Sequence, residues 1–341
     1  MIEAIIIWTV QSWEGFIPRC NMKIISLYSG ADNLGDGVIQ AGFKIKLCVE
    51  MNKDCCETIK LNHPDIEIIN DKVSNVLTTL PKADCIIGGP PCPEFSRAKS
   101  DRTFDLCEVN NFRKAIELTG ATHHFMENVQ DLYQVHKERN FLINCADYGV
   151  PQTRIRRIFT DLPLPKATHS QYPSHTLFEE PMKKWISIKE ALNLNDDLMY
   201  ISPGGFKNKN KELISREINE PIQTIVNGNE YLLTNYPIKS IKYIRNKNPI
   251  MYDKHKPNLL TSPCSTITAK DRSTPSDMVT NGKVARKLTN EELSILQGFR
   301  TDFKFYGGKT SVRKQIGNAL PAAVSKAFFL ELQKMILAQH N

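Results

Sequence analysis

Residues 23–50, KIISLYSGADNLGDGVIQAGFKIKLCVE, decide the expected fold. An apolar, β-branched run at its start is followed by a turn that contains Gly30 and by the start of a helix. A second apolar run follows at residues 44–49 and ends beside Glu50. A strand, a glycine-containing turn, a helix and a second strand in this order predict a βαβ unit with parallel strands.

The alternation of short apolar runs with helix-like stretches continues as far as residue 160. The predicted strands lie at residues 23–28, 44–49, 67–69, 85–87, 123–126 and 156–160, and the predicted intervening helices at 53–63 and 110–120. Strands that alternate with helices are typical of a largely parallel sheet with helices on both faces. We therefore predict the α/β class with a mostly parallel, doubly wound sheet.

The composition changes after Pro163. Pro, Asn, Lys and Ser become frequent there, and only short β runs remain, such as residues 221–226 and 265–269. This change marks a predicted domain boundary.

Helical spacing returns near the end of the chain. Thr289, followed by Glu292 three residues later, predicts a capping box at the start of a helix over residues 289–299. A last helix is expected from about residue 321 to residue 337.

The overall composition is that of a globular protein. Of 341 residues, 41% are hydrophobic and 24% charged, and the mean hydropathy is −0.34. No apolar run approaches the ~20 residues of a transmembrane helix. The longest, residues 4–10, follows the acidic Glu3 and lacks a signal-peptide cleavage site. We expect a cytoplasmic protein, or a nuclear one in a eukaryotic host, with no membrane partner.

Cysteine and charge content limit the kinds of partner. The nine cysteines include no C-x-x-C pair and no zinc spacing, so neither a disulfide framework nor a metal site is indicated. A net charge of +7 permits a polyanionic partner. Residues 203–256 hold ten Lys/Arg and five Asp/Glu residues, which makes this segment the expected place for phosphate contacts.

The turn within residues 27–43 lies where a doubly wound fold binds a nucleotide-like ligand. Glu50 ends the second predicted strand, where a carboxylate typically accepts hydrogen bonds from ribose hydroxyls. Asp71 follows the third strand and could accept from an adenine amino group. Each acid taken alone also fits a solvated turn residue.

A cysteine follows the fourth predicted strand in DCIIGGPPCPEFSR, residues 84–97. Two prolines restrict the backbone before Cys92, which would place its thiol at the ligand-binding edge of the sheet. A thiolate presented there is a candidate nucleophile. A small buried side chain is the alternative interpretation for an isolated cysteine.

Two further strand ends supply polar groups. The stretch MENV contributes Glu127 and Asn128, and PQTRIR contributes Arg154 and Arg156. A thiolate, a carboxylic acid and a guanidinium together suit attack on a planar heterocycle that is a poor electrophile. If the acid binds a ring nitrogen and arginine a carbonyl oxygen, the thiolate can add to the ring and leave an electron-rich carbon that takes a methyl group.

These stretches resemble the cytosine-C5 DNA methyltransferases, which transfer a methyl group from S-adenosyl-L-methionine. The resemblance rests on LYSG, VEMN, GGPPCPEFS, MENV, YGVPQTRIR, RKLTNEELSILQGF and QIGNALP, which follow one another in the order of the family between residues 23 and 321. It implies a Rossmann-like S-adenosylmethionine-dependent methyltransferase fold.

The resemblance also implies residue roles. Cys92 would be the nucleophile for cytosine C6, Glu127 would contact N3 and the exocyclic amine, and Arg156 with Arg154 would hold O2. The cofactor site would be lined by Tyr28, Gly30, Glu50, Met51, Asp71, Pro90 and Asn318. The target cytosine would be flipped out of duplex DNA, as for other enzymes that react at a stacked base.

The domain organisation implied by the resemblance has four parts. They are an N-terminal extension (1–21), the first part of the catalytic domain (22–165), an irregular target-recognition domain (166–283) and a return to the catalytic domain (284–341). A monomer that contacts DNA through the basic insert 203–256, with a companion restriction endonuclease, is expected.

Two alternatives remain open. A transfer-RNA cytosine-C5 methyltransferase of the same family would use the same chemistry. A catalytically silent nucleic-acid-binding relative is motivated by a shortened segment between Val129 and Asp147 and by Asp32-Asn33, which stands where the family usually has Gly-Gly. Asn tolerates φ > 0, so this residue can keep the turn, whereas a carboxylate beside the cofactor would be unusual.

Overall fold

The computed structural model describes the chain in segments between residues 22 and 339. The described ranges are 22–91, 106–134, 138–173, 181–193, 199–201, 215–217, 222–223, 232–234, 241–245, 248–250, 278–280 and 283–339. Cys92, the expected extension 1–21 and the β run predicted at 265–269 lie outside these ranges, as does much of the basic insert 203–256.

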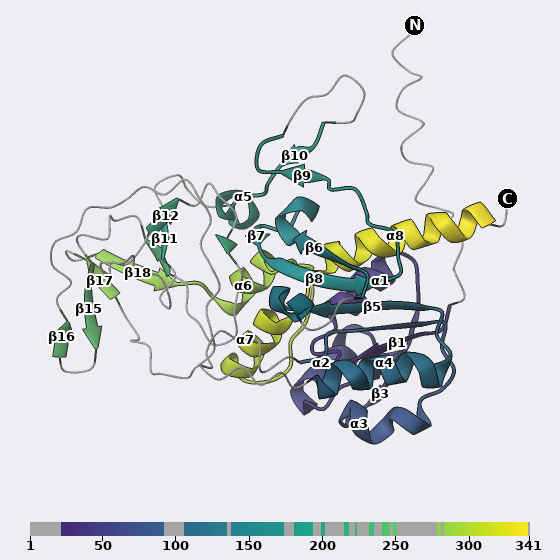
Figure 1. Cartoon of the computed structure of the whole chain (residues 1–341). Helices are drawn as coiled ribbons and strands as arrows, with labels where there is room; N and C mark the ends of the chain where they lie inside the picture. The colour runs from purple at the N-terminus through teal and green to yellow at the C-terminus, as the bar shows by residue number, and fades with distance from the viewer. Residues whose placement is uncertain are drawn as a thin grey trace, which may run out of the picture.

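A seven-stranded sheet forms the centre of the large domain (Figure 1). Its strands, in spatial order, are β3 (Glu67–Ile69), β2 (Ile45–Val49), β1 (Ile24–Leu27), β4 (Cys85–Gly88), β5 (His123–Asn128), β8 (Ile155–Thr160) and β6 (Asn140–Asn144). The strands β1 to β5 are parallel, and β8 is antiparallel to both of its neighbours. The predicted α/β class with a mostly parallel sheet is confirmed.

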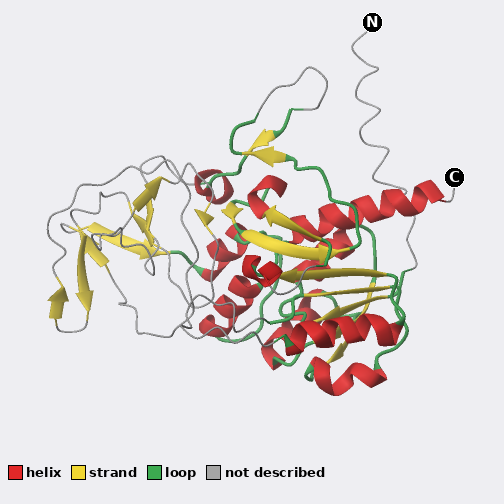
Figure 2. Ribbon diagram, in the orientation of Figure 1, coloured by secondary structure: helices red, strands yellow, loops and turns green. Residues whose placement is uncertain are grey.

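Helices cover both faces of this sheet (Figures 1 and 2). One face carries α1 (Asn33–Gln40), α2 (Lys53–Asn62) and α8 (Ala322–Gln339), and the other carries α3 (Val73–Val76) and α4 (Cys107–Thr119). Successive side chains of a strand point to opposite faces. Accordingly Ile24 and Ile87 lie in the hydrophobic cluster under α1 and α8, whereas Ile25 and Ile86 lie in the cluster under α4.

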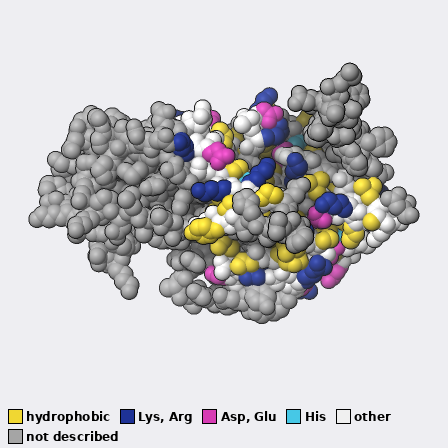
Figure 3. All heavy atoms as spheres, turned by 90° about the horizontal axis from the view of Figure 1, so that it is seen from above, with side chains coloured by type: hydrophobic (Ala, Val, Ile, Leu, Met, Phe, Trp, Pro, Cys, Tyr) yellow, Lys and Arg dark blue, Asp and Glu magenta, His cyan; other side chains and the backbone are white. Residues whose placement is uncertain are grey.

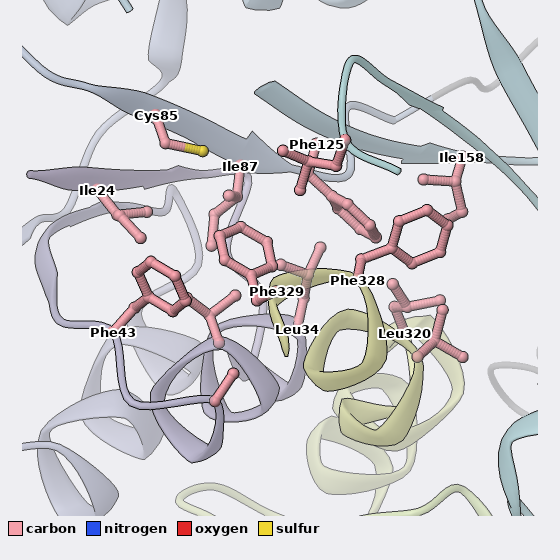
Figure 4. Packing of buried hydrophobic residues seen from close by; sticks show 14 of the residues in the cluster. Ile24, Leu34, Phe43, Cys85, Ile87, Phe125, Ile158, Leu320, Phe328 and Phe329 are labelled. Atoms are coloured by element: carbon pink, nitrogen blue, oxygen red, sulfur yellow. The ribbon is translucent and has the colours of Figure 1, made fainter. Parts of the chain in front are cut away.

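Aromatic side chains of α8 fill the first of these clusters (Figure 4). Phe329 meets Phe43 edge to face with a centroid distance of 5.3 Å, and Phe328 meets Phe125 in the same way at 5.3 Å. All four rings are buried. The last helix is therefore part of the core beside the first strands rather than a peripheral addition.

The C-terminal segment returns to the large domain through α6 (Asn290–Leu296) and α7 (Lys309–Asn318). The predicted capping box is confirmed, because Glu292 N–H donates to Thr289 Oγ1 (3.2 Å) and Thr289 N–H donates to Glu292 Oε2 (2.9 Å). The short helix α5 (Ile188–Leu192) packs against α6 in a third hydrophobic cluster.

Short elements connect these parts. They are the 3₁₀ helices η1 (Leu77–Thr79), η3 (Gln130–Gln134) and η4 (Cys145–Tyr148), and the strands β7 (Gln152–Thr153), β9 (His169–Ser170), β10 (Lys183–Lys184) and β13 (Ile222–Gln223). The strand β7 pairs with β13 and β9 pairs with β10, in both cases in parallel. The predicted β run at residues 221–226 thus contains a strand that reaches back to the large domain.

A second sheet lies beside the large domain, at the left of Figures 1 and 2. Its order is β12 (Ser215–Glu217), β11 (Met199–Ile201), β14 (Leu232–Thr234), β18 (Lys283–Lys287), β17 (Met278–Thr280), β15 (Ile241–Arg245) and β16 (Asn248–Ile250), with antiparallel neighbours throughout. Most of these strands fall within the segment 166–283, whose role in target recognition stays a prediction. Among the described residues, no helix is both long and apolar enough to cross a membrane.

The contact between α1 and α8 gives a test of the fold. A Cβ added at Gly37 would lie 2.1 Å from the Ala322 carbonyl oxygen and 2.2 Å from Ser325 Oγ. Helix propensity alone predicts that Gly37→Ala stabilises α1 by about 1 kcal/mol. We expect the opposite sign, a loss of roughly 1–3 kcal/mol from overpacking, measured by urea unfolding. Unchanged or increased stability would contradict the described packing.

Candidate active site

The candidate residues gather where the parallel strands end. The turn at residues 28–32 follows β1, Glu50 follows β2, Pro90 lies two residues after β4, and Glu127 is near the end of β5. In the sheet, β2 and β3 lie to one side of β1, whereas β4 and β5 lie to the other. Ligands of doubly wound folds bind at such a switch point, outside the carboxyl ends of the strands.

The turn at residues 28–32 has an unusual backbone. Tyr28, Gly30 and Asp32 all have left-handed conformations, with φ of 53°, 57° and 57°. No atom of the described residues lies within 4 Å of a Cβ built on Gly30, so glycine is favoured here by conformation rather than by space.

The turn and Glu50 hold each other in place. Gly30 N–H donates to Glu50 Oε2 (2.8 Å), and Asn52 N–H donates to Glu50 Oε1 (2.7 Å). Glu50 is 8% exposed. Because an ionised carboxylate has about four acceptor positions, each oxygen retains capacity for one more donor, such as a ribose hydroxyl.

Met51 and Asp71 lie on the exposed side of this region. Asn70 Nδ2 donates to the carbonyl oxygens of Glu50 (2.9 Å) and Met51 (3.1 Å), which joins the chain after β3 to the end of β2. The Met51 side chain is 67% exposed. Asp71 Oδ1 accepts from Lys72 N–H (2.7 Å) and from Asn75 Nδ2 (2.8 Å).

The ends of β4 and β5 are joined by a buried amide. Asn128 is 3% exposed, and its Nδ2 donates to the Pro90 carbonyl oxygen (3.0 Å). At Gly88, a Cβ would lie 2.1 Å from the Leu27 carbonyl oxygen, so this position needs glycine. The backbone that leads toward the nucleophile candidate is therefore held at Gly88 and Pro90, and Pro91 is the last described residue before it.

Glu127 and Arg156 form an ion pair beside this backbone. Arg156 Nε lies 2.8 Å from Glu127 Oε1, and each side chain is 14% exposed. The pair follows from strand register, because Glu127 is opposite Ile158 in the antiparallel β5–β8 pair and Arg156 is two residues from Ile158 on the same face. Glu127 Oε2 lies 3.1 Å from the position of a Cβ at Gly89, where glycine leaves room for it.

Arg154 lies in different surroundings from Arg156. It is 2% exposed, and its Nη2 donates to the Gly317 carbonyl oxygen (3.2 Å), directly before Asn318 at the exposed end of α7. The Arg154 carbonyl oxygen accepts from Cys145 N–H (2.9 Å). Arg154 thus joins the start of β8 to α7, whereas Arg156 joins β8 to Glu127.

A buried pair of amides near Arg154 was not recognised from the sequence. Gln152 Nε2 donates to Gln297 Oε1 (2.7 Å), and Gln297 Nε2 donates to the Ala319 carbonyl oxygen (2.6 Å). Both glutamines are 0% exposed. Both lie in stretches that carry the family resemblance, but their sequence separation of 145 residues gave no signal of contact.

Of the pair Asp32-Asn33, it is Asp32 and not Asn33 that takes a left-handed conformation. Asn33 is the first residue of α1, so the expectation that Asn33 preserves the turn through φ > 0 is wrong. The Asp32 carboxylate is 1% exposed and accepts from Ser26 Oγ (2.8 Å) and Cys48 Sγ (3.5 Å). It fits because Gly35 lacks a Cβ, which would lie 2.1 Å from Asp32 Oδ2.

The Asp32 carboxyl gives a pH-dependent prediction. Burial raises its pKa from 3.8 to about 6, partly opposed by the hydrogen bond from Ser26 and the nearby His63. A raised pKa in the folded state means that the parent protein loses stability as pH rises from about 4 through 6. Asp32→Asn does not titrate, so its stability relative to the parent should increase by on the order of 2 kcal/mol between pH 4.5 and pH 7.5.

Urea unfolding of both proteins at the two pH values measures this difference. Other groups that titrate in that range contribute equally to both proteins, so they cancel in the difference between variant and parent. A stability difference that is the same at both pH values would contradict a raised pKa at Asp32.

Comparison with known proteins agrees with this geometry. The model of the C-5 cytosine-specific DNA methylase family matches residues 22–143 and 133–334. The type II methyltransferase M1.HphI of Haemophilus parahaemolyticus is 28% identical and aligns over 92% of this chain and 87% of its own length. M.HgiDI of Herpetosiphon aurantiacus, also a type II methyltransferase, is 28% identical over 91% of this chain and 93% of its own length.

A similar fold is found in a crystal structure. A prophage-encoded E. coli protein, described as a DNA modification methyltransferase, has a TM-score of 0.57 and 19% identity, and the match covers 93% of this chain and all of that one. The family match extends over both parts of the large domain, including the strand ends that carry Glu50, Glu127 and Arg156. The chain therefore belongs to the C-5 cytosine-specific DNA methylase family.

Proposed function

We propose that this protein transfers a methyl group from S-adenosyl-L-methionine to C5 of a cytosine in duplex DNA, with Cys92 as the covalent nucleophile. The observation that carries the proposal is the Glu127–Arg156 ion pair, at 2.8 Å, beside the backbone at Gly89 and Pro90. A carboxyl and a guanidinium at this place match the groups that a cytosine ring needs on its polar edge.

The residues at the end of β1 and β2 fit the methyl donor. Glu50 keeps acceptor capacity for ribose hydroxyls, and the space beside Gly30 is open among the described residues. Met51 offers an exposed apolar surface to the adenine. Asp71, which follows the Asn70 that binds the Met51 carbonyl oxygen, is proposed as acceptor for the adenine amino group. Tyr28, Pro90 and Asn318 complete the proposed donor site. The donor supplies a methyl group on a sulfonium, which is electrophilic.

Glu127 and Arg156 would act on the cytosine ring. A carboxyl group at N3 withdraws electron density and makes C6 more electrophilic, and an arginine at O2 stabilises the charge that develops there. Arg154 is 2% exposed and donates to the Gly317 carbonyl oxygen. We therefore assign it a structural role, in which it holds the start of β8 and thereby positions Arg156. The direct contact with O2 is assigned to Arg156.

The proposed bond changes at the cytosine balance. The Cys92 thiolate adds to C6, and the displaced electron pair makes C5 nucleophilic, so that C5 bonds to the methyl carbon as the sulfonium bond breaks. Loss of the C5 proton then restores the ring double bond and expels the thiolate. A cytosine in a duplex is stacked on both faces, so it must first be flipped out.

One observation weakens the catalytically silent alternative. The Asp32 carboxylate, which would be unusual beside a cofactor, is 1% exposed and bonded to Ser26 and Cys48. The departure from Gly-Gly therefore places no added charge on the proposed donor surface. A transfer-RNA substrate is kept as an outcome of the experiments below.

The partners proposed here follow from the substrate and from the family. On the described face in Figure 3, Lys and Arg side chains are interspersed with hydrophobic, uncharged and acidic ones. The basic insert 203–256 is proposed to contact DNA phosphates. We further propose a cytoplasmic monomer. The relatives are named type II methyltransferases, which supports a companion restriction endonuclease.

Replacement of Glu127 tests the acid. Glu127→Gln keeps the shape of the side chain but removes its charge and its proton, so methyl transfer should fall by roughly 10²–10⁴ while DNA binding is retained. The matched control is Glu138→Gln, which removes the carboxylate of the exposed Arg113–Glu138 pair (2.8 Å). Transfer of labelled methyl groups to DNA measures both. Equal activity of the two variants would exclude an acid role for Glu127.

A fluorinated substrate tests Cys92. Fluorine at C5 cannot leave as a cation, so DNA with 5-fluorocytosine at the target site should trap a covalent complex that survives denaturing electrophoresis and requires S-adenosyl-L-methionine. Cys92→Ser should abolish this complex, because a hydroxyl is much less acidic and less nucleophilic than a thiol. Cys55→Ser and Cys56→Ser, in α2, should leave it intact.

The same experiment separates the alternatives. A complex that persists in Cys92→Ser would reject the nucleophile assignment. A complex with fluorinated transfer RNA but none with DNA would retain Cys92 and change the substrate. Absence of transfer to either nucleic acid would favour a silent relative.

A further inference from the structure

Tyr28 has a backbone conformation that its side chain disfavours. Its φ of 53° is left-handed, a region that bulky L-residues rarely adopt. Such outliers persist only where surrounding contacts hold them, and they concentrate at functional sites. Tyr28 is the first residue of the turn that places the Gly30 N–H on Glu50.

A hydrogen bond to α4, which covers one face of the sheet, holds Tyr28. Its hydroxyl donates to Glu108 Oε2 (2.7 Å), with the Glu108 carbonyl oxygen at 3.2 Å. Its ring packs against the cluster that contains Val109 and Phe112 of α4. Burial and the neighbouring Glu108 carboxylate raise the pKa of Tyr28 well above its usual range, so the hydroxyl remains a donor at every working pH.

The acceptor is itself well fixed. Glu108 is the second residue of α4, where a carboxylate is favoured by the positive end of the helix dipole. Asn111 Nδ2, one turn further along, also donates to Glu108 Oε2 (3.2 Å). The hydroxyl of Tyr28 therefore ties the turn at residues 28–32 to the first turn of α4, where Asn111 also binds Glu108.

We propose that Tyr28 is a positioning residue for the methyl donor, acting through its hydrogen bond to Glu108. The bond holds the turn at residues 28–32 in the left-handed form that directs Gly30 N–H onto Glu50. When this bond is lost, Tyr28 relaxes toward an ordinary, negative φ. Glu50 then loses the hydrogen bond from Gly30 N–H that orients its Oε2. This inference rests on the proposed function, because it takes Glu50 as the group that binds the ribose.

The inference is tested by measuring how tightly the parent and four variants bind an analogue of the methyl donor. Tyr28→Phe removes the hydroxyl and Glu108→Met removes the acceptor carboxylate at similar length, and the double variant removes both. The matched control is Tyr148→Phe, because the half-buried Tyr148 hydroxyl also donates to a carbonyl oxygen, that of Pro165 (3.1 Å), but from η4. Calorimetric titration with S-adenosylhomocysteine gives Kd for each protein.

We expect Tyr28→Phe and Glu108→Met each to raise Kd by about tenfold, because loss of a hydrogen bond to a charged group lowers the population of the binding-competent turn by about that factor. The double variant should bind no more weakly than the worse single variant, since both changes delete the same bond. Tyr148→Phe also loses one hydroxyl hydrogen bond, so its melting temperature should fall about as much as that of Tyr28→Phe. Its Kd should nevertheless equal that of the parent. In turnover, Tyr28→Phe should raise the KM for the methyl donor by a larger factor than it lowers kcat.

Three results would overturn the inference. They are a parent-like Kd in Tyr28→Phe, an equal rise of Kd in Tyr148→Phe, and effects of the single variants that multiply in the double variant. A parent protein that binds neither S-adenosylhomocysteine nor S-adenosyl-L-methionine would instead reject the proposed function, and the inference with it.

Discussion

The close contact between α1 and α8 is the constraint on which the arrangement of the site depends. Gly37 lets the two helices approach, Ser325 Oγ donates to the Leu34 carbonyl oxygen (2.7 Å), and Asn33 Nδ2 donates to the Leu320 carbonyl oxygen (3.1 Å). Because α1 follows the turn at residues 28–32 and α8 follows the QIGNALP stretch, this contact brings that turn and that stretch close together. The C-terminal return thereby completes the edge at which β1 to β5 end.

A second set of contacts joins the C-terminal return to β8, the strand that directly follows Arg154 and contains Arg156. The buried Gln152–Gln297 pair and the Arg154–Gly317 hydrogen bond join β7 and β8 to α6 and α7. Removing one partner of such a buried bond leaves the other without compensation for its lost water, which costs more than the bond contributes. These groups therefore fix how α6 and α7 pack against β7 and β8. They thereby also fix the position at which Arg156 meets Glu127.

Local patterns in the sequence predicted the elements whose contacts are local. The strands at residues 23–28, 44–49, 85–87 and 123–126 match β1, β2, β4 and β5, because β-branched runs buried on both faces are typical of parallel strands. The strand β6 was not predicted, and the antiparallel direction of β8 was not foreseen. Edge strands lack a continuous apolar run, and strand direction depends on partners distant in the sequence. The contacts of Arg154 and of the two glutamines were missed for the same reason, whereas the ion pair of Glu127 with Arg156 follows from the two strand ends singled out from the sequence.

The turn at residues 28–32 shows how a chain can keep a conformation while it loses the usual glycines. Of its three left-handed residues, only Gly30 adopts the conformation without a steric cost. Tyr28 is held by Glu108 on the α4 face of the sheet, and Asp32 is held by Ser26 and Cys48 under α1, on the opposite face. The two flanking residues thus anchor the turn from both sides, and Gly30 between them remains free to direct its N–H at Glu50. Side-chain hydrogen bonds here replace the conformational freedom that glycine supplies elsewhere. The shape of the donor surface therefore depends on the partners Glu108, Ser26 and Cys48, which the proposed donor site does not include.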